Sequence, residues 1–124
     1  MTSSGPSFVV LYRWRLRAGA ESAFVEAWSR VTQRLRSERG SLGSRLHRGT
    51  DGLWYGYAQW PDAQARDRAF AAGPVDADAM QRMRESIEES LPEIVLESVA
   101  DFLVLPSAPL DPAGVQLTQE RPRG

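Results

Sequence analysis

The stretch GSLGSRLHRGTDGLWYGYAQWPD, residues 40–62, decides the fold. It predicts two strands, over residues 42–48 and 53–60, joined by a tight turn at residues 49–52, because Asp and Gly tolerate the positive φ angles of a hairpin. The second strand, LWYGYAQW, alternates so that aromatic residues lie on both of its faces. Neither face is therefore simply left in water. The Pro-Asp pair that follows ends the strand and offers an N-cap to a helix.

The rest of the chain supplies strands and helices on either side of this hairpin. Alternating aromatic residues in FVVLYRWRLR predict a strand over residues 8–17, whose face carrying Tyr12 and Trp14 packs on the helices. Apolar residues at helical spacing predict a helix over residues 21–39. After the hairpin, the sequence predicts helices over residues 62–72 and 76–90 and a last strand over residues 97–105.

This β-α-β-β-α-β order, with the second helical region split in two, predicts an α+β fold of the ferredoxin-like split βαβ type. The four-stranded antiparallel sheet is expected in the order 4-1-3-2, and we expect its two central strands, the first and third, to run parallel to each other. The domain spans residues 8–105. Residues 1–7 are expected to be a disordered N-terminus, and residues 106–124 a Pro-rich tail or dimer arm.

Helices on one side of the sheet leave its other face bare. That face is expected to carry Val9, Leu11, Val99 and Leu103. Several hundred Å² of exposed apolar surface is uncommon in a monomer. The sequence therefore predicts a two-fold homodimer in which two sheets pack face to face.

Composition excludes several function classes. The net charge of −1 gives no electrostatic reason to expect nucleic acid as a partner. The absence of Cys removes thiol nucleophiles and thiolate metal sites, and the absence of Lys removes Schiff-base chemistry. The N-terminal residues lack the pattern of a signal peptide, and the apolar runs are far too short to span a membrane. We expect a cytoplasmic protein.

Three segments carry a family resemblance: FVVLYRWRLRAGAESAFVEAW, the hairpin, and Trp60 followed by PDAQARDRAF. Together they resemble the antibiotic biosynthesis monooxygenase family of small dimeric α+β barrel proteins. The resemblance implies a pocket between sheet and helices in each protomer. It also implies oxidation of phenols, anthrones or quinols by O₂ with no cofactor. Related haem-degrading proteins use an Asn on strand 1 and a Trp and a His in the second helical region. Here Tyr12 stands on strand 1, and residues 62–90 contain neither Trp nor His, so haem degradation is not expected.

Two residues are candidates for proton transfer, each with a structural alternative. His47, the only histidine, could take a phenolic proton because its pKa lies near neutrality. It could equally be an ordinary edge-strand histidine. Tyr12 is the second catalytic candidate, and its alternative is core packing. No set of metal ligands is expected, because one His and scattered carboxylates do not make a site.

The candidate substrate-binding residues are aromatic, because such side chains hold a flat aromatic ligand. They are Trp14, Trp28, Tyr55, Tyr57 and Trp60. Plain core packing is the alternative for each of them. Arg66 and Arg68 are expected on a solvated helix face.

Three functions follow from these residues. The first is a cofactor-independent monooxygenase acting on a phenolic, anthrone or quinol-type small molecule. The second is a non-catalytic small-ligand-binding or interaction dimer, favoured by the lone His and the absence of Asn. The third is a polyketide-type cyclase or isomerase that uses the same pocket for proton transfer.

Overall fold

The computed structural model describes residues 8–104 as one sheet covered by helices. The elements are β1 (Phe8–Leu16), α1 (Glu21–Arg39), β2 (Gly43–Arg48), β3 (Trp54–Trp60), α2 (Ala63–Ala71), α3 (Ala77–Ser86) and β4 (Ile87–Glu97). The sheet order β2-β3-β1-β4 confirms the predicted order, read from the other edge. The predicted N-terminal and Pro-rich segments lie outside the described residues. Among the described helices, none is long and apolar enough to cross a membrane.

The direction of the central strands differs from the prediction. β1 pairs with β3 antiparallel, and β3 pairs with β2 antiparallel. The hairpin reverses the chain between β2 and β3, while the crossover through α1 makes β2 parallel to β1. The expectation that the first and third strands run parallel was therefore wrong.

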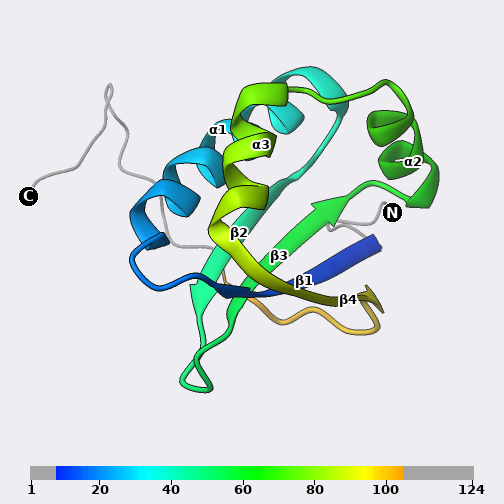
Figure 1. Ribbon diagram of the computed structural model, residues 1–124. Helices are drawn as coiled ribbons and strands as arrows, with labels where there is room; N and C mark the ends of the chain where they lie inside the picture. The colour runs from blue at the N-terminus through cyan, green and yellow to red at the C-terminus, as the bar shows by residue number, and fades with distance from the viewer. Residues whose placement is uncertain (1–7, 105–124) are drawn as a thin grey trace, which may run out of the picture.

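The helices cover one face of the sheet. Figure 1 shows α1 and α3 side by side above the strands, with α2 at the other end of the sheet. Val10 and Trp60 pack with Ala65 and Ala69 of α2, and Trp14 packs with Phe24 of α1. The predicted inward face of the first strand is thus confirmed.

The last helix is shorter than predicted, and the last strand begins earlier in the chain. Helix α3 ends at Ser86, and the chain enters β4 directly at Ile87, so the predicted helix over residues 76–90 was too long. The predicted strand over residues 97–105 was wrong, because residues 98–104 have no regular structure. The apolar spacing that suggested helix continues past Ser86, but the free edge of β1 takes up this segment as a strand.

Pro92 lies inside β4. The register between β1 and β4 shifts beside it, between the pairs Leu11–Ile94 and Arg13–Leu91. Pro lacks an N–H, which an edge strand tolerates at a bulge. Arg13 Nη2 donates to the carbonyl oxygen of Pro92 at 2.8 Å and so satisfies an acceptor there.

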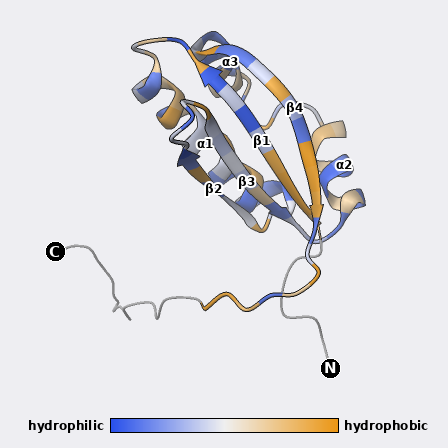
Figure 2. Cartoon of the chain, turned by 90° about the horizontal axis from the view of Figure 1, so that it is seen from below, coloured by the Kyte–Doolittle hydropathy of each residue, from blue (hydrophilic) through white to orange (hydrophobic). Residues whose placement is uncertain are grey.

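The face away from the helices is apolar at one end and charged at the other. Figure 2 shows β1 and β4 hydrophobic where Val9 and Leu11 meet Leu96 and Ile94, and hydrophilic toward the other end of both strands. Val9 is buried, whereas Ile94 and Leu96 are exposed. Val99 and Leu103, expected on a strand of this face, instead lie in the irregular segment after β4.

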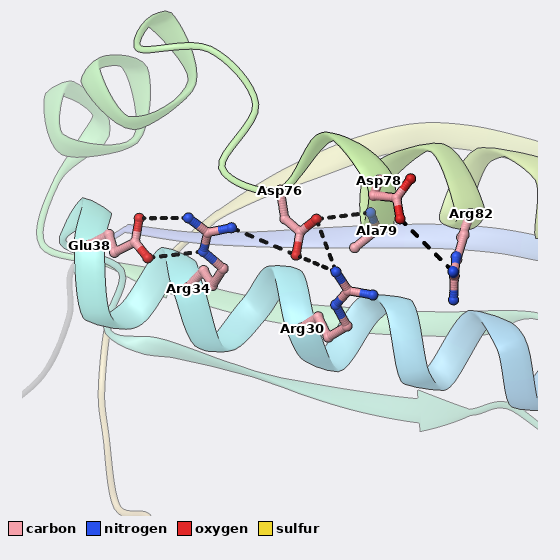
Figure 3. Close-up of polar contacts among 7 residues, drawn as sticks. All are labelled: Arg30, Arg34, Glu38, Asp76, Asp78, Ala79 and Arg82. Atoms are coloured by element: carbon pink, nitrogen blue, oxygen red, sulfur yellow. Dashed lines mark hydrogen bonds and ion pairs between the residues drawn. The ribbon is translucent and has the colours of Figure 1, made fainter.

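One carboxylate joins the two long helices. Asp76 caps α3 by accepting from the Ala79 N–H at 3.0 Å, and it also accepts from Arg30 of α1 at 3.0 Å (Figure 3). Arg34, which pairs with Glu38 on the same helix, lies 3.8 Å from the Asp76 carboxylate. The bonded Ala79 N–H and these guanidinium groups hold the pKa of Asp76 below its ordinary value.

Replacing Asp76 with Ala removes the cap and the tie to α1 together. We expect the D76A variant to unfold at lower urea concentration than the wild type, followed by circular dichroism. D78A is the matched control, because Asp78 lies in the same turn but reaches only Arg82, at 3.9 Å, and is exposed. D78A should stay within about 0.5 kcal/mol of the wild type.

The same pair of proteins yields a pH test. A carboxyl whose pKa is depressed on folding stabilises the fold above its unfolded pKa, here near 3.8. That stabilisation is lost as pH falls through the depressed folded value. The difference in unfolding free energy between wild type and D76A should therefore be largest at neutral pH. It should shrink as the pH falls below about 3.8 and through the lower pKa of the folded state. A gap arising wholly from lost packing would not change with pH.

Candidate functional site

A cavity of about 290 Å³ lies between the helices and the sheet. Its wall is mostly aromatic and apolar, with a few polar side chains. The lining residues include Tyr12, Trp14, Trp28, Ser44, Gly56, Trp60, Arg66, Phe70, Met80, Met83, Arg84 and Ile87. A largely apolar cavity with few polar groups is the ordinary form of a small-molecule site.

Trp14 forms one side of this cavity because Gly56 has no side chain. A Cβ at Gly56 would lie 2.8 and 3.0 Å from two atoms of the Trp14 ring, closer than real Cβ contacts allow. The Trp14 ring stacks on Tyr12 with centroids 5.9 Å apart and planes 9° from parallel. It meets Phe24 edge-on at 5.1 Å. Tyr12 and Trp14 thus form an aromatic wall of the cavity, with Phe24 packed behind Trp14 in the core.

The hydroxyl of Tyr12 is the polar group held most firmly in the wall. Arg66 donates to the Tyr12 oxygen from Nη2 at 2.9 Å and from Nε at 3.2 Å. The same Nη2 donates to Glu93 Oε1 at 2.7 Å. The Arg66 guanidinium carbon also lies 5.6 Å from the Tyr12 ring centre and 5.3 Å from that of Phe70. Arg66 is therefore fixed by an acid and by two rings.

Burial raises the pKa of Tyr12 above its ordinary value of 10.0, and the nearby positive charge of Arg66 offsets part of that rise. The negative charge of Glu93 acts in the same direction as burial. Tyr12 is consequently a neutral phenol at physiological pH. It carries a proton that it can donate.

Trp60 carries a buried polar atom without a partner. Its side chain is 1% exposed, and its indole Nε1 has no hydrogen-bond partner within residues 8–104. A buried N–H without a partner costs free energy. Trp60 also lines the cavity, but the Nε1 atom itself is enclosed by protein atoms.

The structure separates the predicted site residues into two groups. Tyr12, Trp14, Trp28 and Trp60 line the cavity together. The others, His47, Tyr55 and Tyr57, lie on the opposite face of the sheet, since His47 pairs with Tyr55 and alternation places these residues away from the helices. Their assigned roles stay predictions, because the cavity brings none of them to Tyr12.

Two of the residues on the opposite face have surroundings of their own. His47 and Tyr57 border a second recess of about 450 Å³, to which Leu103 also contributes. The hydroxyl of Tyr55 donates to the Asp51 carboxylate in the hairpin turn, and this bond lowers the pKa of Asp51. Within the described part of the chain, no three His, Asp or Glu side chains group as metal ligands.

Arg66 is the functional residue that sequence reasoning missed. It was expected on a solvated face, and yet its side chain is 16% exposed. Arg68, two residues on, is exposed as predicted. The available signal was the cap: Asp62 accepts from the Ala65 N–H at 2.7 Å and fixes where α2 begins. Counting from that residue places Arg66 and Phe70 on one helix face.

Comparison with known proteins gives the class of this chain. The family model described as antibiotic biosynthesis monooxygenase matches residues 7–86, more than half of the sequence. The chain belongs to that family, as its sequence resemblance indicated. No functionally curated protein matches it.

Solved structures share the fold. SnoaB, a cofactor-independent oxygenase from Streptomyces nogalater, superposes with a TM-score of 0.65 at 19% identity, over 78% of this chain and 97% of that one. Rv0793 from Mycobacterium tuberculosis superposes with a TM-score of 0.63 at 18% identity, over 77% of this chain and 98% of its own. A putative antibiotic biosynthesis monooxygenase from Chloroflexus aurantiacus superposes with a TM-score of 0.62 at 14% identity, over 76% of this chain and 94% of its own. At these identities the likeness establishes the fold alone.

The Trp14–Gly56 contact leads to a prediction. Gly56→Ala should displace the Trp14 ring and cost about 1–3 kcal/mol, the usual range for overpacking a core. Urea unfolding measures the cost, and near-ultraviolet circular dichroism reports the indole. Ser44→Ala, which removes an atom from the same cavity wall, should leave the indole signal unchanged. Wild-type behaviour of G56A on both readouts would contradict the contact.

Proposed function

We propose that this protein is a cofactor-independent monooxygenase that oxidises a phenolic, anthrone or quinol-type small molecule with O₂. The observation that carries the proposal is the aromatic cavity with the Tyr12 hydroxyl held in its wall by Arg66. Family membership supports it, and so does the likeness to SnoaB, which is a cofactor-independent oxygenase.

In this proposal the substrate supplies the electrons. A flat ring lies against Trp14 and Trp28, and one of its oxygen atoms accepts a hydrogen bond from the Tyr12 hydroxyl. Loss of a substrate proton gives an electron-rich anion that O₂ oxidises. One atom of O₂ enters the substrate, and the other leaves as water with the two hydrogens that the substrate loses. The protein contributes orientation and exclusion of water.

A second candidate is the non-catalytic small-ligand-binding dimer. One observation favours it: the residues that line the cavity include no Asp, Glu or His. A pocket without a general base suits binding as well as turnover. The same observation weighs against the cyclase or isomerase alternative, which needs a group to shuttle protons within the site.

Oxygen uptake tests the proposal. The purified protein should consume O₂ with at least one member of a panel of anthrones, hydroquinones and catechols, in the presence of a metal chelator. Tyr12→Phe removes one hydroxyl from the cavity and should lower the rate about tenfold or more, as loss of a buried hydrogen bond to a charged group would. His47→Ala, on the other face of the sheet, should keep the wild-type rate.

The contrary results are equally specific. A rate lost in H47A but retained in Y12F would move the chemistry to the opposite face of the sheet. No uptake across the panel, together with ligand-induced thermal stabilisation, would favour the binding protein.

We also propose that the protein is a homodimer formed through the open sheet face and the segment after β4. Large apolar side chains of that segment are almost wholly exposed: Val99 and Phe102 at 91%, Val104 at 88% and Leu103 at 78%. Together with Ile94 and Leu96 they extend the apolar end of the sheet face. Exposed apolar surface of this kind is typical of an interface.

A charge in this segment tests the dimer. Phe102→Asp should shift the protein from dimer to monomer at micromolar concentration in light scattering, because it buries a carboxylate in an apolar contact. Val25→Asp is the control, since Val25 is an exposed apolar residue on α1, away from the sheet face. Loss of the dimer in both variants, or a monomeric wild type, would contradict the proposed interface.

A further inference from the structure

Arg66 determines which way the Tyr12 proton points. A phenol oxygen has one proton to donate and two lone pairs that accept. Both hydrogen bonds from Arg66 end on this oxygen, at 2.9 and 3.2 Å, so the lone pairs are engaged on the guanidinium side. No hydrogen bond joins the Tyr12 proton to an acceptor in residues 8–104: the guanidinium carries only donors, and the neighbouring Glu93 carboxylate accepts from Arg66 instead. The proton is left available to an acceptor in the cavity.

The side chains that line the cavity also suit a ligand that accepts hydrogen bonds. The titratable side chains that line the cavity are Tyr12 from β1, Arg66 from α2 and Arg84 from α3, while those from α1, β2 and β3 are uncharged. Arg84 bonds only to neutral Gln81, at 2.6 Å, and pairs with no acid in residues 8–104. Glu93 of β4 lies outside the lining and balances the charge of Arg66, and Arg84 is exposed to solvent. The lining therefore contains hydrogen-bond donors and no acid.

We infer that Arg66 is a positioning residue that turns the Tyr12 hydroxyl toward the ligand, as a hydrogen-bond donor to the oxyanion that the proposed oxidation requires. The inference rests on the proposed function and names the residue that positions its donor. The ligand's O–H bond breaks, the proton passes to solvent water, and the resulting oxyanion accepts the hydrogen bond from Tyr12. No base in the wall is needed, because stronger binding of the anion lowers the pKa of the ligand.

The probe is 2-hydroxyanthraquinone, a flat phenol whose absorption spectrum changes on ionisation and which is already at the quinone oxidation level. Bound to the wild type, it should show a ratio of ionised to neutral form at least about tenfold higher than in buffer at the same pH. Tyr12→Phe removes only the hydroxyl, and Arg66→Gln removes the fork that orients it. In both variants the ratio should fall back by about tenfold, with binding retained.

Three matched measurements separate positioning from charge or stability. Arg68→Gln changes the net charge equally from an exposed position on the same helix and should leave the ratio as in the wild type. Arg66→Lys keeps the charge but loses the two-point donor, so it should not restore the ratio. The methyl ether of the probe has no proton to lose, so its dissociation constant should be the same in wild type and R66Q.

The opposite results overturn the inference. One is a probe that is ionised no more on the wild type than in buffer. Another is a ratio of ionised to neutral probe in R66K that equals the wild-type ratio. The third is a ratio that falls as far in R68Q as in R66Q. Absence of probe binding to the wild type also overturns it. The outcome is independent of oxygen uptake: an ionised probe on a protein that consumes no O₂ supports the inference and counts against the monooxygenase.

Discussion

The close approach of Trp14 to Gly56 is the constraint on which the site depends. The indole occupies the space that any other residue at position 56 would fill, since even a Cβ there would meet the ring at 2.8 Å. Its position aligns Tyr12 on one side and Phe24 on the other, with centroids 5.9 and 5.1 Å away. Trp14 and Tyr12 line the cavity side by side, and Arg66 bonds to the Tyr12 hydroxyl there.

The two faces of the sheet have separate chemistry because strand residues alternate. Along β3, Trp54, Gly56, Ala58 and Trp60 face the helices, and Tyr55 and Tyr57 face away. The cavity is therefore lined by the indole rings on the helix side of the sheet. His47, Tyr55 and Tyr57 lie on the opposite side. A sequence motif rich in aromatic residues thus serves two surfaces, and the mostly apolar cavity lies on the helix side.

Much of the fold could be predicted from local patterns. The α1 bounds, the hairpin and the inward face of β1 follow from periodicity, turn residues and the glycine at the end of α1. β4 could not, because Ile87 and Leu91 keep helical spacing and only pairing with β1 makes the segment a strand. In the site, Tyr12, Trp14, Trp28 and Trp60 were expected from composition and face. Arg66 was not, because its role depends on reaching across from α2 to β1 and β4.

The direct passage from α3 into β4 has a mechanical consequence. Ile87 lines the cavity and is also the first residue of the edge strand, with no loop between them to absorb movement. A guest molecule that pushes α3 outward must pull on the backbone bonds that join Ile87 and Glu89 to β1. Entry and release are thereby tied to fraying of the sheet edge, so hydrogen exchange at the start of β4 should report the lifetime of the occupied state.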